Sequence, residues 1–266
     1  MAASPSRVRH RVARRPPSPR PRSSPPPLCG KKPAAPPPPP PLPSRQNLVL
    51  VGGRACGKSS VCRRLLSHDK RFNLFSMDAL IRYEAGGKEV AGIVAERGWR
   101  GFRDLEYEVA AKCASFPGFA LVDCGGGVVV DLAEAPPGEE PQEVFSERKV
   151  SLLRASGLVV YVRRPVAYLE RRLARKAEDA NRPALSATQG FAEVMARREP
   201  WYEAAAHVVV DGCDERGAPL PKAEIAGKVL GHFYRASGAE PPLAKDPIER
   251  ARKLSTLDEA LAAALR

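Results

Sequence analysis

Residues 47–60 read Asn47-Leu-Val-Leu-Val-Gly-Gly-Arg-Ala-Cys-Gly-Lys-Ser-Ser60, and the fold prediction starts from this stretch. Its first five residues form an apolar, β-branched run that is typical of a buried strand. Residues 52–59 fit the phosphate-loop pattern G-x-x-x-x-G-K-[ST], and residues 59–66 have the composition of a helix. A strand before the pattern and a helix after it are the context in which this pattern indicates nucleotide binding.

The chemistry of such a loop follows from its residue types. Glycines allow backbone amides to turn inward around phosphate oxygens, and the start of a helix adds partial positive charge. Lys58 is expected to reach the β- and γ-phosphates of ATP, and the Ser59 hydroxyl to hold Mg²⁺. Ala55 stands where many such loops have glycine. The residues expected to bind the nucleotide are Gly52, Gly53, Arg54, Ala55, Cys56, Gly57, Lys58, Ser59 and Ser60.

Three further apolar runs alternate with helical patterns along the chain. The expected strands are 120–122, 158–162 and 207–211, and the expected helices are 104–115, 165–177, 190–205 and 222–236. Strands that alternate with helices favour a parallel sheet covered by helices on both faces. The sequence therefore predicts a three-layer α/β fold in a single domain over residues 47–236.

The first 46 residues differ sharply from this domain. They contain eight Arg, two Lys, 16 of the 28 prolines and no acidic residue. Such a segment cannot bury a core. Its composition favours an organelle transit peptide, and the proline content favours a plastid, so we expect localisation in the chloroplast stroma. The alternative is a disordered Pro-rich tail or a ligand for SH3-type domains.

The leader also accounts for most of the charge. The whole chain carries a formal charge of +13, of which +10 lies in residues 1–46. The remaining +3 and the few aromatic residues give no strong reason to expect nucleic acid as a partner. No run of 18 apolar residues suggests a membrane span. The six cysteines lack CxxC spacing, and we expect no zinc site.

The last 30 residues, 237–266, are expected to be a linker and an amphipathic tail. Leu254, Leu257, Leu261 and Leu265 recur at spacings of three and four, which places them on one helical face. The tail either packs on the domain or binds a protein partner.

A set of motifs beyond the phosphate loop narrows the chemistry. They are Phe75–Ile81, Gly101–Glu106, Gly125–Gly127, Asn181–Leu185 and Arg197–Tyr202. In this order and spacing the chain resembles shikimate kinase over about residues 47–212. The resemblance implies a P-loop fold like that of the nucleoside monophosphate kinases, with a mobile lid around residues 174–188. It also implies a monomer.

The resemblance assigns tasks to particular residues. Asp78 matches the carboxylate that contacts the acceptor hydroxyl, and such a group can accept the proton of that hydroxyl. Arg103 and Arg198 match the pair that binds the acceptor's carboxylate, a task that suits guanidinium groups. Gly125, Gly126 and Gly127 would let the backbone approach the acceptor. Arg182 matches the lid arginine, which together with Lys58 would stabilise charge on the transferred phosphoryl group. From context alone, Asp78 could equally be a helix N-cap, and Arg103 with Glu106 a surface pair.

The sequence departs from the family pattern at several positions. The family has Asp-x-Asp before the second helix, whereas Ser76 stands at the first of these positions here. Arg82 and Trp99 stand where glutamates are usual, and we expect these changes beside the acceptor and metal sites. Asp123 follows a strand, two residues before Gly125. Our hypothesis is that Asp123 takes over the Mg²⁺-binding duty lost at Ser76.

Four functions are compatible with these residues. The leader, the departures and the tail resemble plant plastid shikimate-kinase-like proteins, which implies a diverged ATP-binding protein with a role in chloroplast biogenesis. This is the leading interpretation, and it leaves activity on shikimate open. The first alternative is an active shikimate kinase, which transfers the γ-phosphate of ATP to the shikimate 3-hydroxyl. The others are a kinase for another small acidic hydroxy compound and, from a different class, a nucleic-acid-binding protein.

Overall fold

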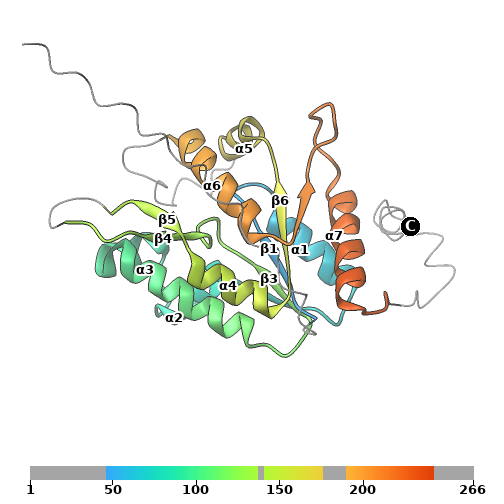
Figure 1. Ribbon diagram of the computed structural model, residues 1–266, viewed down its shortest axis with the longest axis horizontal. Helices are drawn as coiled ribbons and strands as arrows, with labels where there is room; N and C mark the ends of the chain where they lie inside the picture. Colours follow the sequence, from blue (N-terminus) through green and yellow to red (C-terminus); the bar gives the residue numbers. More distant parts are fainter. Residues whose placement is uncertain (1–45, 137–140, 176–189, 243–266) are drawn as a thin grey trace, which may run out of the picture. The chain divides into compact units, whose positions relative to one another are not determined.

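The computed structural model describes residues 46–136, 141–175 and 190–242 (Figure 1). The leader up to residue 45, the leucines of the tail, Arg182 and most of the predicted lid lie outside these ranges. In chain order the elements are β1 (Leu48–Val51), α1 (Lys58–His68), β2 (Asn73–Ser76), α2 (Met77–Glu84), α3 (Val90–Ala114), β3 (Ala120–Asp123), β4 (Val130–Leu132), β5 (Glu143–Phe145), α4 (Glu147–Ser156), β6 (Leu158–Arg163), α5 (Val166–Leu173), α6 (Phe191–Ala205), β7 (Val208–Asp211) and α7 (Lys222–Ser237).

A five-stranded parallel sheet forms the centre of the domain. The strand order is β2-β3-β1-β6-β7, so the strand before the phosphate loop lies in the middle. All four residues of β1 and of β3 are buried, because both faces of these strands are covered. The predicted α/β architecture is therefore confirmed.

Helices cover the two faces of the sheet (Figure 1). α1 and α7 pack against each other on one face, while α3 and α4 pack together on the other. Because β1 and β3 are parallel, their carboxyl ends lie at the same end of the sheet, where the phosphate loop follows β1 and Asp123 is the last residue of β3. No helix within the described ranges is long and apolar enough to cross a membrane.

The structure contains elements that the sequence patterns did not predict. The edge strand β2 is four residues long and largely exposed, so it lacks the apolar run that identifies its neighbours. Helices α2 and α4 and the separate two-stranded β4–β5 ribbon were also missed. The helix expected over 104–115 begins at Val90 and contains a break at Gly98, whose φ of 68° suits glycine.

A buried ion cluster joins the elements on the α3 side of the sheet. The Glu106 carboxylate on α3 accepts hydrogen bonds from Arg103 Nη1 at 2.9 Å and from Lys149 Nζ at 2.7 Å. Lys149 lies on α4 with a fully buried side chain, and it also donates to the carbonyl of Val130 on β4. Burial acts to raise the pKa of Glu106, but the two cations outweigh it and hold this pKa below its ordinary value. The ionised glutamate therefore stabilises the contact of α3 with α4.

Truncation of Lys149 should destabilise the domain. Lys149→Ala removes one of the two buried cations that pair with Glu106 and should lower the free energy of unfolding by about 3–5 kcal/mol in urea titrations. The matched control is Lys112→Ala, because Lys112 pairs with Glu84 at 2.7 Å but is 60% exposed. That variant should lose less than about 1 kcal/mol. Equal losses in the two variants would contradict a structural role for the buried cluster.

Candidate nucleotide and acceptor site

The phosphate loop has the backbone geometry that its glycines predict. It leaves β1 at Val51 and enters α1 at Lys58. Gly52 and Gly57 have φ values of 142° and 106°, in the region that side-chain-bearing residues rarely adopt. The first turn of α1 contains no acidic residue, so its partial positive charge is available to an anion. This arrangement can bind phosphate through backbone amides.

Ala55 adopts the conformation expected of a glycine at its position. Its φ is 65°, and it is one of two non-glycine residues with positive φ in the described chain, Phe119 being the other. An L-residue in this conformation costs roughly 1–2 kcal/mol. The departure noted in the sequence thus adds backbone strain to the loop.

Lys58 lies folded over the loop. Its ammonium group donates to the carbonyls of Gly52 at 2.8 Å and Gly53 at 3.1 Å, and only 8% of the residue is exposed. Burial acts to lower the pKa of Lys58, but nearby acidic groups, with Cys56 and Asp123 first among them, outweigh it and raise this pKa. Lys58 therefore remains a cation where the phosphates are expected.

Two side chains whose oxygen atoms can bind a metal ion, Asp123 and Ser59, lie near this lysine. Asp123, at the end of β3, is 9% exposed and interacts with the Ser59 side chain at the start of α1. Burial is the largest effect on the pKa of Asp123 and raises it, as does the charge of Asp78. Lys58 and Ser59 act to lower this pKa, but it remains above its ordinary value. A divalent cation would offset this penalty, and Mg²⁺ prefers one or two carboxylates together with phosphate oxygens and water. The residues present therefore fit Mg²⁺.

Strand register relates Asp123 to the missing carboxylate. Ser76 and Asp123 are directly paired residues of neighbouring parallel strands, β2 and β3. A carboxylate at either position would thus stand at the same edge of the sheet. This pairing gives a geometric basis for the hypothesis that Asp123 takes over the Mg²⁺-binding duty lost at Ser76.

The Gly125–Gly127 turn lies between the phosphate loop and the acceptor residues. A Cβ on Gly125 would lie 2.8 Å from Asp78 Oδ1, and one on Gly126 would lie 3.2 Å from the backbone nitrogen of Arg54. A Cβ on Gly127 would lie 2.2 Å from Arg103 Nη1. Three predicted functional groups therefore converge on this turn, and they do so because it lacks side chains.

Asp78 belongs to the first turn of α2, which begins at Met77. The N-cap of this helix is Ser76, so the alternative reading of Asp78 as an N-cap is wrong. Arg82, on the same helix, forms an exposed ion pair with Glu89 at 2.9 Å. Its guanidinium is therefore at the surface and engaged by Glu89.

Arg103 is buried, with 6% of its surface exposed. Nη1 donates to Glu106 at 2.9 Å and to the Gly127 carbonyl at 3.2 Å. The i,i+3 pair with Glu106 thus exists, but in the interior and not on the surface. Among the described residues Nε of Arg103 has no hydrogen-bond partner. A buried cationic N–H without an acceptor is costly, and an incoming carboxylate would satisfy it.

Arg198 lies on α6 and is 1% exposed. Nε and Nη2 both donate to the carboxylate of Glu143 on β5, Nε at 3.0 Å. Arg198 also interacts with the Tyr202 side chain, whose hydroxyl donates to the Gly126 carbonyl. Through Tyr202, Arg198 is connected to the same glycine turn as Arg103.

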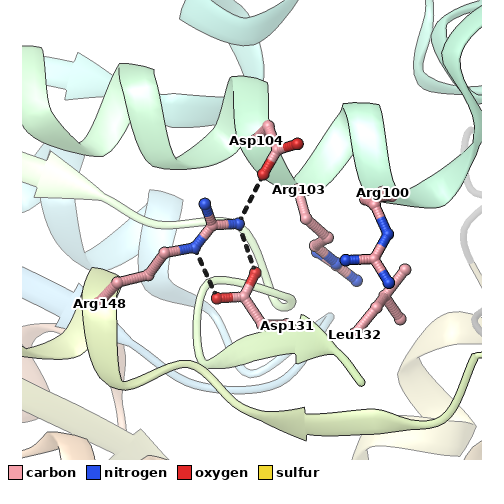
Figure 2. A pocket seen from close by; sticks show the side chains of 6 residues that line it. All are labelled: Arg100, Arg103, Asp104, Asp131, Leu132 and Arg148. Carbon is pink, nitrogen blue, oxygen red and sulfur yellow. Dashed lines mark hydrogen bonds and ion pairs between the residues drawn. The ribbon is translucent and has the colours of Figure 1, made fainter. Parts of the chain in front are cut away.

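A pocket of about 200 Å³ adjoins this cluster at Arg103. Figure 2 shows Arg148 bridging Asp131 on β4 and Asp104 on α3 across it. Arg100, Arg103 and Leu132 complete the lining. Arg103 therefore reaches open space from its buried position.

Sequence reasoning missed the partners of the predicted residues. Lys149, the second partner of Glu106, and Glu143, the partner of Arg198, lie on elements that were not predicted. Tyr202 was part of a recognised motif without a task of its own. Trp99, noted as a departure, packs on Phe102 with their ring centroids 5.7 Å apart. The Arg103 guanidinium carbon lies 5.6 Å from the centroid of the Trp99 ring.

Comparisons with known proteins agree with this geometry. The family model described as Shikimate kinase matches residues 54–136 and 141–231. Shikimate kinase from Leptospira biflexa is 36% identical over 184 residues, covering 69% of this chain and 93% of the relative. A structure of shikimate kinase from Acinetobacter baumannii in complex with shikimate superimposes with a TM-score of 0.56 at 26% identity. The superposition covers 71% of this chain and 93% of that one.

Filling the space above Gly127 should displace Arg103. In Gly127→Ala the new Cβ meets the guanidinium, so binding of an anionic acceptor should weaken at least about tenfold, the loss of about 1.4 kcal/mol. ATP binding should be preserved. Gly118→Ala is the control, since no atom lies within 4 Å of its added Cβ. Unchanged shikimate affinity in calorimetric titrations of Gly127→Ala would contradict the assignment of Arg103.

Proposed function

Because the chain belongs to the shikimate kinase family, we propose that it is an active shikimate kinase. The reaction is transfer of the γ-phosphoryl group of ATP to the 3-hydroxyl of shikimate. The observation that carries this proposal is the convergence of the phosphate loop, Asp78 and Arg103 on the Gly125–Gly127 turn. The solved relative in complex with shikimate supports the choice of acceptor.

Each residue has a defined task in this reaction. The loop amides and Lys58 bind the β- and γ-phosphates, and Lys58 opposes the negative charge of the transferred group. Asp78 orients the acceptor hydroxyl and takes its proton as the oxygen attacks phosphorus. Arg103 binds the acceptor's carboxylate through its unpaired Nε. Arg182, outside the described residues, is proposed to close on the phosphates.

The metal task is assigned to Ser59 and Asp123, with no role for Ser76. When bound by Ser59 and Asp123, Mg²⁺ would supply positive charge that offsets the charge of the phosphates and reduces their repulsion of the incoming oxygen. The support is the contact of Ser59 with Asp123 and the register of Asp123 with Ser76.

A second candidate function is a diverged plastid protein that binds ATP without phosphorylating shikimate. Ser76 specifically favours it, because the family pattern has a carboxylate at this position. The resemblance to plant plastid proteins adds the proposed role in chloroplast biogenesis.

Turnover measurements separate the two functions. The full chain, supplied with MgATP and shikimate, should release ADP at roughly 1–100 s⁻¹, as kinases do. Asp78→Asn should lower this rate by about 10²–10⁴, the contribution of a positioned base. Asp211→Asn, at the exposed end of β7, should keep the rate. ATP binding without any turnover in the wild type would reject the first candidate and support the second.

The metal assignment predicts a selective loss. Asp123→Asn should weaken nucleotide binding in the presence of Mg²⁺ about tenfold or more, which corresponds to about 1.4 kcal/mol, and leave metal-free ATP binding nearly unchanged. Asp211→Asn serves as the control, because Asp211 also ends a parallel strand but pairs with Arg163 at the surface. An unaltered affinity of Asp123→Asn for MgATP would remove Asp123 from the metal site.

The leader is proposed to direct import into the chloroplast stroma. Its support is the basic, acid-free and Pro-rich composition of residues 1–46. A fluorescent protein fused behind these residues should accumulate in plastids of leaf cells. A fusion in which the eight leader arginines are replaced by glutamine should stay outside. Plastid import of both fusions, or of neither, would refute the proposal.

A further inference from the structure

Glu143 occupies the arginine that the acceptor's carboxylate is expected to use. Its two carboxylate oxygens accept hydrogen bonds from Nε and Nη2 of Arg198, which is the fork-to-fork geometry of a bidentate pair. Arg197 adds a third bond, from Nη2 at 2.8 Å. Within the described residues, Glu143 thus has the position and charge of a bound carboxylate ligand.

Arg198 has no exposed face left for a second anion. It is 1% exposed, its Nε–Nη2 edge faces Glu143, and Tyr202 interacts with the guanidinium as well. Burial acts to raise the pKa of Glu143, but Arg198 and Arg197 outweigh it and hold this pKa below its ordinary value. Glu143 is therefore ionised. A second carboxylate at this edge would meet both a filled site and a like charge.

Arg103 differs from Arg198 in this respect. Arg103 also has a glutamate partner, but its Nε is unpaired and its side chain lines the pocket. Of the two arginines expected to bind the acceptor, one has an unpaired donor and lines the pocket, and the other is engaged by Glu143. The acceptor can therefore contact Arg103 first, and contact with Arg198 requires a change at Glu143.

The β4–β5 ribbon that carries Glu143 allows this change. The ribbon has three residue pairs and is not part of the central sheet. Asp131 is held by Arg148 and Ser146, at 2.8 Å and 2.7 Å. The Glu143–Leu132 pair is followed by one more backbone hydrogen bond, from the Ala133 N–H to the Gln142 carbonyl at 2.9 Å. A two-stranded ribbon is marginally stable alone, so this outer end can open at Glu143 while Asp131 stays fixed.

We propose that Glu143 is an internal competitor for the acceptor's carboxylate: it holds Arg198 in the free protein and must leave Arg198 before an anionic acceptor is fully bound. The inference rests on the proposed function and adds a regulation of the same site. Glu143 lowers the affinity for shikimate and for other carboxylates that need Arg198. Nucleotide binding should be unchanged, because Glu143 accepts its hydrogen bonds from Arg197 and Arg198 on α6, whereas Lys58 donates to Gly52 and Gly53.

The test is calorimetric titration of the full-length protein with shikimate and, separately, with MgATP. Glu143→Gln keeps the shape and a hydrogen-bond acceptor but removes the charge that repels the ligand. It should bind shikimate about tenfold more tightly and MgATP as the wild type does. Glu143→Asp, whose side chain is one methylene shorter, should show a smaller gain in shikimate affinity. If the glutamine variant does not fold, the aspartate variant is used in its place. The matched control is Glu203→Gln, since Glu203 lies on the same helix as Arg198 but pairs with Arg163 at the surface.

The outcomes distinguish the competitor from the proposed function. Tighter shikimate binding in the Glu143 variants supports the competitor, even where the wild type binds too weakly to detect. Equal binding in wild type and variants, with shikimate turnover intact, overturns the competitor alone. Weaker binding in Glu143→Gln also overturns it and makes Glu143 a positioning residue for Arg198. No shikimate binding by any of the proteins overturns both the competitor and the assignment of shikimate.

Discussion

The close approach of the Gly125–Gly127 turn to its neighbours is the constraint on which the site depends. Its three glycines lie against Asp78, the backbone of Arg54 and the guanidinium of Arg103. A side chain at any of them would separate groups that the proposed reaction brings to one phosphoryl group and one hydroxyl. The parallel sheet makes this approach possible. Because β1 and β3 are parallel, their carboxyl ends lie at the same end of the sheet, and the loops that follow them lie side by side.

Buried charge is the second requirement of this arrangement. Arg103 is held inside the protein by Glu106, and Glu106 in turn by Lys149. Arg198 is held inside by Glu143. Isolated ions are not tolerated at such positions, so each guanidinium comes with a carboxylate from a different place in the chain or the next turn of its helix. The acceptor side is thus a set of paired charges, in which the availability of each arginine depends on its glutamate.

The sequence predicts the central strands of the sheet but neither its short edge strand β2 nor the β4–β5 ribbon. β1, β3 and β6 are apolar on both faces, and the phosphate loop has a fixed spacing, so local patterns identified them. β2 and the β4–β5 ribbon are short and partly exposed, and no local pattern distinguishes them from loops. For the site, the motifs singled out Asp78, Arg103, Gly125–Gly127 and Arg198, but the contacts of Lys149 with Glu106 and of Glu143 with Arg198 join residues 43 and 55 apart in the chain. Such pairings arise only from the tertiary structure.

The separation of the β4–β5 ribbon from the central sheet has a consequence for how this protein can change over generations. Insertions or deletions between its two strands alter no ladder hydrogen bond of the sheet and shift none of the strands that carry the phosphate loop. Surface connections tolerate such length changes at low thermodynamic cost. The ribbon is therefore a place where natural variation can retune preference for one acceptor over another while the nucleotide machinery is inherited intact.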